Sequence, residues 1–479
     1  MRLIDKYRKL AIQPKAVIWY TICSFFQRGI SYLVVPIYVR LLTTGEYGEW
    51  SVFQSWSGIL IVFTSLNLSC GVFTKTIVDM QDGKERDRYT ASMQGLGTVT
   101  TLLFFLIYLL TMRMSNRIVG LNTPLFLLLF FFFLVYPSFS FWIGRQRVEY
   151  KYKSMVVVTL IVSILTPGVS LVLLEYTTLR AQALILGYLI VQSFIGLVFY
   201  IYHFIKGKCF YDKKFWKYAT GFNIPLIPHY LSLIVLNQSD RIMIKDICGD
   251  SEAGIYSFAY QIASAITLLI SSINGARSPW TYEKLRNKEF EGLKKITTLL
   301  VVFMLGSALL FSLFAPEIVG IIGTTEYSQA MYVIPVVTVG VFFTFVYDLY
   351  ASIEFYYGAT KYVMVASVTG ALANLGLNAL FIPQYGFIAA AYTTLVCYVA
   401  FAVMHFIFSK KVLRMNTEVS AVYDDYTIGI LSLGMIVVGL GVMASYGFFW
   451  LRMVLIITMI LFCLFKRETI KQVLVAIKR

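Results

Sequence analysis

Long stretches without a charged residue recur along the chain, and short segments rich in Lys and Arg separate them. A helix needs about 20 apolar residues to cross the hydrocarbon core of a membrane. The pattern therefore predicts fourteen membrane-spanning helices, of which two contain an internal charge. The predicted spans are 16–39, 50–74, 89–112, 118–144, 154–174, 181–205, 218–247, 253–276, 296–316, 327–347, two helices within 362–409, 426–451 and 453–465.

The segment 362–409 carries no Asp, Glu, Lys or Arg over 48 residues, which is too long for one crossing. It contains the sequence Ile-Pro-Gln-Tyr-Gly at 382–386. Proline and glycine mark turns, so this motif predicts a tight connection between two helices.

The distribution of basic residues predicts the orientation. With fourteen spans, 33 of the 41 Lys and Arg residues fall on the side of the two termini, 6 fall on the other side, and Arg28 and Arg241 lie inside spans. Loops that remain in the cytoplasm are enriched in Lys and Arg. Both termini are therefore predicted to be cytoplasmic. The basic segment 1–15 precedes a span without a small-residue cleavage site, which favours an uncleaved first helix over a signal peptide.

Composition narrows the class of function. Hydrophobic residues make up 58% of the chain and charged residues 14%, against about 25% charged in soluble domains. This excludes a soluble enzyme and a nucleic-acid-binding module, and the net charge of +16 reflects membrane topology. The six cysteines form no CxxC pair, and the chain has no P-loop, HExxH or GxSxG motif. We therefore expect no cofactor, no metal site and no enzymatic activity.

An internal repeat is suggested by two copies of the pattern E-x-G-x-aromatic-S, at 46–51 and 252–257, spaced 206 residues apart. Both copies join an odd-numbered span to the next one, which favours a true repeat over chance. The sequence predicts an N-terminal lobe at 1–217 (helices 1–6), a C-terminal lobe at 218–415 (helices 7–12), and a final helix pair with a tail at 416–479.

Arg28 is the main candidate for substrate binding. An arginine at the centre of a span costs about 2.5–3.5 kcal/mol on insertion scales. A polar stripe at helical spacing accompanies it, made of Thr21, Ser24, Arg28 and Ser31, with Gln27 adjacent. The stripe predicts a face that lines a watery cavity, where Arg28 attracts an anionic headgroup such as a pyrophosphate. The alternative is neutralisation of Arg28 by a neighbouring helix, for instance by Asp348.

Other polar residues in the spans are candidates for coupling or gating. Asp240 and Arg241 form either a local pair that holds helices together or an outer gate. Arg277, near the predicted cytoplasmic mouth, either reaches the interface or contacts a headgroup. Asp348 is the best candidate for a proton or sodium site. Pro225 and Pro228 predict a kinked or broken start to the seventh span.

Several segments together resemble the polysaccharide-transporter (O-antigen flippase) proteins. They are the segment Leu33–Leu42 followed by Glu46-Tyr47-Gly48, the segment Ile224–His229 followed by Ser239-Asp240-Arg241 and Ala253–Tyr256, and the segment Asn378–Gly386 followed by Ala389-Ala390-Ala391. The similarity covers nearly the whole chain, and the order and spacing of the motifs are specific.

This family belongs to the multidrug/oligosaccharidyl-lipid/polysaccharide (MOP) exporter superfamily. The resemblance implies an all-α integral membrane protein with two six-helix lobes in a V around a central cavity, and two added C-terminal helices. It implies translocation of an undecaprenyl-pyrophosphate-linked oligosaccharide, such as an O-antigen repeat unit, across the bacterial inner membrane by alternating access. A proton or sodium gradient is the implied drive. A polysaccharide polymerase and a chain-length regulator are candidate partners.

Three alternatives remain open at this stage. A cation-coupled multidrug exporter of the same superfamily would favour acidic residues in its cavity, whereas the central charge here is basic. A membrane glycosyltransferase or polymerase would need a large outer loop, and none is predicted. A membrane scaffold without transport is disfavoured by the polar stripes.

Overall fold

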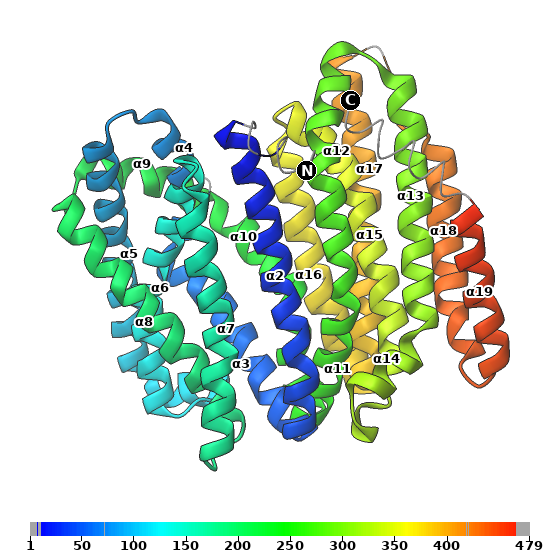
Figure 1. Cartoon of the computed structure of the whole chain (residues 1–479), viewed down its shortest axis with the longest axis horizontal. Coiled ribbons are helices and arrows are strands. Elements are labelled where there is room, and N and C mark those ends of the chain that lie inside the picture. The colour runs from blue at the N-terminus through cyan, green and yellow to red at the C-terminus, as the bar shows by residue number, and fades with distance from the viewer. Residues whose placement is uncertain (1–6, 8–10, 71, 418, 420, 466–479) are drawn as a thin grey trace. The chain divides into compact units, whose positions relative to one another are not determined.

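The computed structural model (Figure 1) describes Tyr7 and residues 11–70, 72–417, 419 and 421–465. These residues are almost entirely helical and contain no β-strand. The prediction of an all-helical membrane protein is confirmed. The basic tail from Lys466 onward and most of the basic N-terminal segment lie outside the described residues.

The helices divide into two compact units. The first is Met1–Tyr38 with Glu49–Gln238, and the second is Val39–Gly48 with Ser239–Arg479. In chain order the α-helices are α2 (Ile12–Leu41), α3 (Thr44–Ser65), α4 (Val72–Asp79), α5 (Gly83–Val119), α6 (Thr123–Val148), α7 (Tyr152–Tyr176), α8 (Ala181–Gly207), α9 (Lys213–Asn223), α10 (Ile227–Ile247), α11 (Asp250–Ala263), α12 (Thr267–Asn287), α13 (Phe290–Leu313), α14 (Ala315–Ile322), α15 (Ala330–Tyr356), α16 (Thr360–Tyr385), α17 (Phe387–Asn416), α18 (Asp425–Gly441) and α19 (Phe449–Phe465). The domain boundaries expected from the sequence remain predictions.

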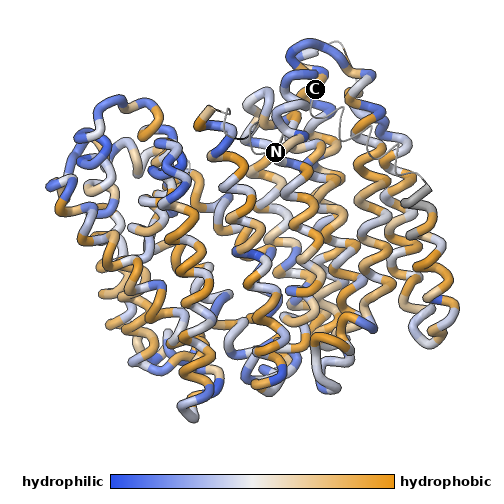
Figure 2. Tube along the Cα trace, in the orientation of Figure 1, coloured by the Kyte–Doolittle hydropathy of each residue, from blue (hydrophilic) through white to orange (hydrophobic). Residues whose placement is uncertain are grey.

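Twelve helices of the described part are long and apolar enough to cross a membrane, with α9–α10 and α11–α12 each counted as one. Each corresponds to a predicted span. The two remaining predicted spans correspond to α3 and α19, which fall outside this set. Figure 2 shows hydrophobic residues along the helices and hydrophilic residues concentrated near many of their ends.

The seventh predicted span is broken, as its prolines predict. A short 3-10 turn at Ile224–Leu226 separates α9 from α10, with Pro225 inside the turn and Pro228 in the first turn of α10. Proline has no N–H to donate and clashes with the preceding helical turn. The eighth span has an equivalent break at Ser264–Ile266, which its sequence does not announce with a proline.

The predicted span at 50–74 is wrong as one continuous helix. The helix α3 ends at Ser65, and the next two residues, Leu66 and Asn67, take positive φ values of 48° and 50°. The side chain of Asn223 donates a hydrogen bond to the carbonyl oxygen of Leu66 at 3.1 Å. The carbonyl groups at the end of a helix have no partner within the helix, and Asn223 supplies one of them with a donor. Because Asn223 lies 157 residues away, the local sequence does not predict this hydrogen bond.

The two copies of the repeated motif contact each other within the second unit. A Cβ on Gly48 would lie 1.9 Å from the carbonyl oxygen of Asp250, and a Cβ on Gly254 would lie 1.9 Å from the carbonyl oxygen of Thr44. The two contacts are equivalent, because Gly48 and Gly254 differ by the repeat spacing of 206 residues, and so do Thr44 and Asp250. The hydroxyl oxygens of Thr44 and Ser251 lie 2.6 Å apart at the same place. The motif glycines therefore allow the starts of α3 and α11 to meet backbone to backbone.

We predict that Gly254→Ala destabilises the protein by about 1–3 kcal/mol, the usual range for overpacking, because the new methyl group meets a backbone carbonyl. The measurement is the thermal unfolding midpoint of the purified protein in detergent. Gly292→Ala on α13 is the control, since a Cβ there meets nothing within 4 Å. Equal midpoints for the two variants would show that the contact at Gly254 is not a packing constraint.

Candidate functional site

The polar stripe predicted on the first span lies on an exposed side of α2. The side chains of Ser24, Arg28 and Ser31 are exposed, and Gln27 is half-buried. The hydroxyl of Ser31 donates to the carbonyl oxygen of Gln27 at 3.1 Å. The stripe is thus accessible rather than sealed by packing inside the first unit.

Three strongly exposed apolar residues in the middle of α2 lie away from the polar stripe, although Val17, 60% exposed, lies only about 20° from Arg28 around the axis at about 100° per residue. Phe25, Phe26 and Leu33 are 64%, 54% and 73% exposed. At about 100° per residue, they fall within one arc of about 100°, and the buried Cys23 lies beside this arc, about 60° from Phe26. Arg28 and its polar neighbours lie outside this arc. A helix whose exposed surface faced lipid alone would carry apolar side chains over all of that surface. The polar stripe of α2 therefore favours a second, polar environment on one side.

The second unit contains a buried carboxylate that three helices supply with donors. Asp240 has no exposed surface. It accepts hydrogen bonds from the hydroxyl of Tyr256 on α11 at 2.5 Å, from the amide of Asn378 on α16 at 2.6 Å, and from the hydroxyl of Thr394 on α17 at 2.8 Å. Because a buried carboxylate is tolerated only when its oxygens are satisfied, these contacts define a polar centre within a hydrophobic unit.

A second layer of hydrogen bonds holds those donors. The amide of Asn374 donates to the hydroxyl oxygen of Thr394 at 3.0 Å, and its carbonyl oxygen accepts from the hydroxyl of Ser239 at 3.2 Å. The hydroxyl of Thr393 donates to the side-chain carbonyl of Asn378. The helical spacing of Asn374 and Asn378 is visible in the sequence, but it fits close helix packing equally well.

Arg241, the neighbour of Asp240 in sequence, has a different environment. Its guanidinium lies over the ring of Tyr260, 4.7 Å from the ring centroid. A cation over an aromatic face is stabilised by the ring quadrupole. Asp240 and Arg241 are therefore both buried, with the guanidinium over the ring of Tyr260 and the carboxylate hydrogen-bonded to donors on α11, α16 and α17.

Arg277 is buried against α15 and has 1% of its surface exposed. Its Nε donates to the side-chain oxygen of Asn274 at 3.1 Å, and its Nη2 donates to the backbone oxygen of Asp348 at 3.2 Å. The amide of Asn274 donates to the carboxylate of Asp348 at 2.8 Å. The structure thus brings two predicted site residues together through Asn274, and the sequence analysis did not identify this link.

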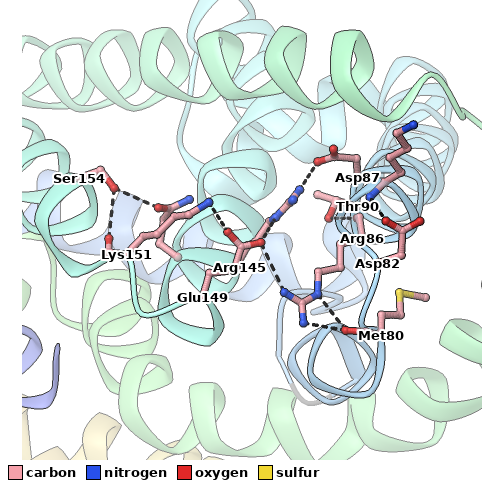
Figure 3. A network of polar contacts seen from close by, with 11 residues as sticks. Met80, Asp82, Arg86, Asp87, Thr90, Arg145, Glu149, Lys151 and Ser154 are labelled. Carbon is pink, nitrogen blue, oxygen red and sulfur yellow. Dashed lines mark hydrogen bonds and ion pairs between the residues drawn. The ribbon is translucent and has the colours of Figure 1, made fainter. Parts of the chain in front are cut away.

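The first unit has a charged network at the junction of α5, α6 and α7 (Figure 3). Arg145 donates to Asp87 and, at 2.7 Å, to Glu149. Arg86 lies 3.7 Å from Glu149 and donates to a backbone carbonyl, and the Lys151 ammonium lies 2.6 Å from the other oxygen of Glu149. These bases neutralise acids, so they are not candidates for an anionic substrate.

The chain matches known protein families in sequence. The family model described as "Polysaccharide biosynthesis protein" matches residues 14–283, more than half of the chain. The chain belongs to this family. A second model, described as MatE, matches residues 225–380. The resemblance to the MOP exporter superfamily is confirmed.

Two relatives are membrane proteins of unassigned function. One, from Haemophilus influenzae, is 26% identical over 376 residues, which is 74% of this chain and 87% of the relative. The other, from Methanocaldococcus jannaschii, is 21% identical over 446 residues and 85% of each chain.

Two solved structures share the fold. The inward closed conformation of the lipid II flippase MurJ has a TM-score of 0.66 at 14% identity and covers 95% of this chain and 100% of that chain. An inward-facing multidrug resistance transporter of the MATE family has a TM-score of 0.58 at 13% identity and covers 85% and 96%. The first of these solved structures is named as a flippase and the second as a transporter.

We predict that Asn378→Leu lowers the free energy of unfolding by about 1.5–3 kcal/mol, the range for hydrogen bonds to charged groups, because Asp240 loses its donor at 2.6 Å. Thermal unfolding in detergent measures this loss. Asn416→Leu is the control, since the amide of Asn416 donates to a carbonyl of its own helix. A loss no larger than that of the control would contradict the assignment.

We predict that Glu149→Gln lowers the stability of the folded protein, and that the size of this loss depends on pH. Burial raises the pKa of Glu149, but the charged hydrogen bonds from Lys151 and Arg145 outweigh it and bring the pKa below its usual value. A lowered folded-state pKa adds stability above the unfolded value, about 4.3 for Glu, and that stability disappears as the pH falls through the folded value. The variant therefore unfolds at a lower temperature than wild type at pH 7. The difference between the two unfolding midpoints disappears in acid.

Unfolding midpoints measured from pH 7 down to about pH 3 test this prediction. The control is Glu291→Gln, because Glu291 is 91% exposed and pairs with Lys294 on the surface. A gap that stays constant with pH would show that the charge of Glu149 contributes nothing.

Proposed function

We propose that this protein moves an undecaprenyl-pyrophosphate-linked oligosaccharide from the cytoplasmic to the outer leaflet of a bacterial inner membrane by alternating access. The observation that carries the proposal is the exposed polar stripe around Arg28, on a span of a chain that belongs to a polysaccharide biosynthesis family. An O-antigen unit or a similar surface-polysaccharide repeat unit is the proposed cargo.

The physical argument for Arg28 starts from its surroundings. An arginine that faces lipid at mid-span costs several kcal/mol, and nothing in the separation of polar and apolar sides on α2 requires it to face lipid. A guanidinium in a water-filled path offers paired N–H donors that match the geometry of a diphosphate. Ser24, Gln27 and Ser31 add neutral hydrogen-bonding groups on either side of the charge.

Arg277 is proposed as a second contact for the diphosphate. In this structure its donors are occupied by Asn274, Ser352 and the backbone of Asp348. Binding of substrate by Arg277 therefore requires these hydrogen bonds to be exchanged during the cycle. Of the two arginines proposed to bind the diphosphate, Arg28 is exposed, and Arg277 needs a conformational step to release its donors.

Coupling to a cation gradient is proposed to involve Asp240 and Asp348, with Arg241 in gating. Asp240 is a carboxylate whose hydrogen-bond donors come from three helices, so a change in its charge would alter the packing of all three. We propose that both termini are cytoplasmic, in keeping with the distribution of basic residues.

A cation-coupled multidrug exporter is the second candidate, and the match of the MatE model to residues 225–380 favours it. The two candidates predict different cargo. An exporter of organic cations would lower the accumulation of a cationic dye in cells, whereas a flippase for a lipid-linked glycan would leave dye accumulation unchanged.

We predict that deletion of the gene causes lipid-linked repeat units to accumulate on the cytoplasmic face, and that the wild-type gene restores surface polysaccharide. Arg28→Ala fails to restore it, because the diphosphate loses its cation, and Arg28→Lys restores part of it, because the charge remains without the planar donor pair. Surface polysaccharide and lipid-linked glycan protected from a membrane-impermeant glycosidase are the measurements, with membrane levels of each variant checked by immunoblot.

Arg113→Ala, at an exposed arginine of α5, is the matched control and is expected to behave as wild type. Full restoration by Arg28→Ala at wild-type protein levels would remove Arg28 from the mechanism.

A further inference from the structure

A second buried acid of the C-terminal unit pairs with a histidine. Glu354 near the end of α15 and His405 on α17 both have no exposed surface. The Nδ1 of His405 lies 2.9 Å from Oε1 of Glu354. The two side chains come from helices that pack closely along their length, so the pair is held inside the unit and not at its surface.

Aromatic rings surround the imidazole. The ring of Tyr347 stacks on it with centroids 5.5 Å apart, and the ring of Phe401 meets it edge to face at 4.6 Å. In such apolar surroundings an isolated charge is strongly disfavoured, whereas a neutral pair is tolerated. The environment therefore makes the number of protons on the pair energetically important.

The other titratable groups near the pair are already engaged. Asp348, also on α15, accepts from Asn274, and Arg277 on α12 donates to its backbone. The hydroxyl of Tyr260 on α11 lies 3.3 Å from that of Tyr398 on α17.

The next charges along α17 lie toward the start of α18. Lys410 and Asp425 form an ion pair there, and Asp425 also accepts from Tyr350 at 3.0 Å. Lys410 and Tyr350 thus both bind Asp425. The hydrogen-bond partner of His405 is Glu354.

Each member of the pair has one further polar atom, and this atom forms no hydrogen bond with any of the described residues. These atoms are Oε2 of Glu354 and Nε2 of His405. With Nδ1–H donated to Oε1, the ionised pair carries one negative charge. One proton from water, bound at Nε2, makes the pair neutral, and its return to water restores the charge. Both free atoms can accept that proton without breaking the existing hydrogen bond.

We propose that Glu354 and His405 form a proton-binding site that takes up one proton and releases it during the transport cycle. What the proton drives rests on the proposed function: loading removes a negative charge near Asp348, which loosens the hold of α15 on Arg277 and frees its guanidinium for the diphosphate. Proton binding itself does not depend on the identity of the cargo.

The first experiment follows the protonation of histidine directly. The chain has three histidines, so ¹⁵N-histidine NMR of the full-length protein in phosphatidylethanolamine–phosphatidylglycerol nanodiscs gives three imidazoles, which His229→Gln and His203→Asn help to assign. His203 is the matched control: it is 2% exposed, its Nδ1 lies 3.0 Å from the neutral Gln94, and its Nε2 is also unpartnered.

We expect His405 to change its protonated fraction at least threefold between pH 5 and pH 9, and His203 to stay neutral. In Glu354→Gln, which keeps the amide oxygen as acceptor, we expect His405 to stay neutral throughout. A wild-type His405 that holds one protonation state over the whole range, or one that titrates identically in Glu354→Gln, overturns the proposal. The wild-type titration needs no variant to fold.

The second experiment tests what the proton drives. In proteoliposomes that contain an undecaprenyl-pyrophosphate-linked oligosaccharide, a pH gradient is expected to accelerate flipping by wild type at least fivefold. Glu354→Gln and His405→Asn are expected to lose this acceleration, and His203→Asn is expected to keep it. Acceleration that persists in Glu354→Gln overturns the coupling. Absence of flipping by wild type contradicts the proposed function, and the NMR titration still decides the proton site.

Discussion

Charge inside a hydrophobic unit is the constraint on which the structure depends, and Asp240 shows it most clearly. Its carboxylate lies within a membrane-spanning helix, where neither lipid nor aliphatic side chains can solvate it. Donors from Tyr256, Asn378 and Thr394 replace water and so tie α11, α16 and α17 to α10. The helices are held in register by polar contacts, because apolar packing alone has little directional preference in a membrane.

The arginines of the helices have different kinds of partners. These partners distinguish an arginine that holds helices together from the arginines that we propose bind substrate. Arg145 is neutralised by acids of its own unit, as Figure 3 shows, and serves to hold helices together. Arg277 donates to an amide, a hydroxyl and a backbone carbonyl, none of which carries a full charge. Its guanidinium also interacts electrostatically with the carboxylate of Asp348, to which Asn274 links it. Arg28 is exposed beside neutral polar groups, which makes it the most accessible of the three.

The helix α15 concentrates the chemistry of the second unit. Asp348, Ser352 and Glu354 lie within about its last three turns, and they face Arg277 on one side and His405 on the other. Because α15 also packs against α11, α13 and α17, a change in the charge of one of these groups affects several helices at once. In our proposal, this arrangement links protonation of the Glu354–His405 pair to the release of Arg277.

The sequence by itself determined where the chain can cross a membrane, because hydrophobicity is a local property summed over about 20 residues. It also located the break at Pro225 and the single intramembrane arginine of α2, since a proline or a charge in an apolar run stands out without reference to any partner. Only the tertiary structure decided which polar groups meet. Asn378 and Thr394 reach Asp240 from 138 and 154 residues away, Asn223 helps to end α3 from 157 residues away, and His405 finds Glu354 across 51 residues. Such pairings follow from the packing of helices, and no local pattern of apolar and polar positions encodes them.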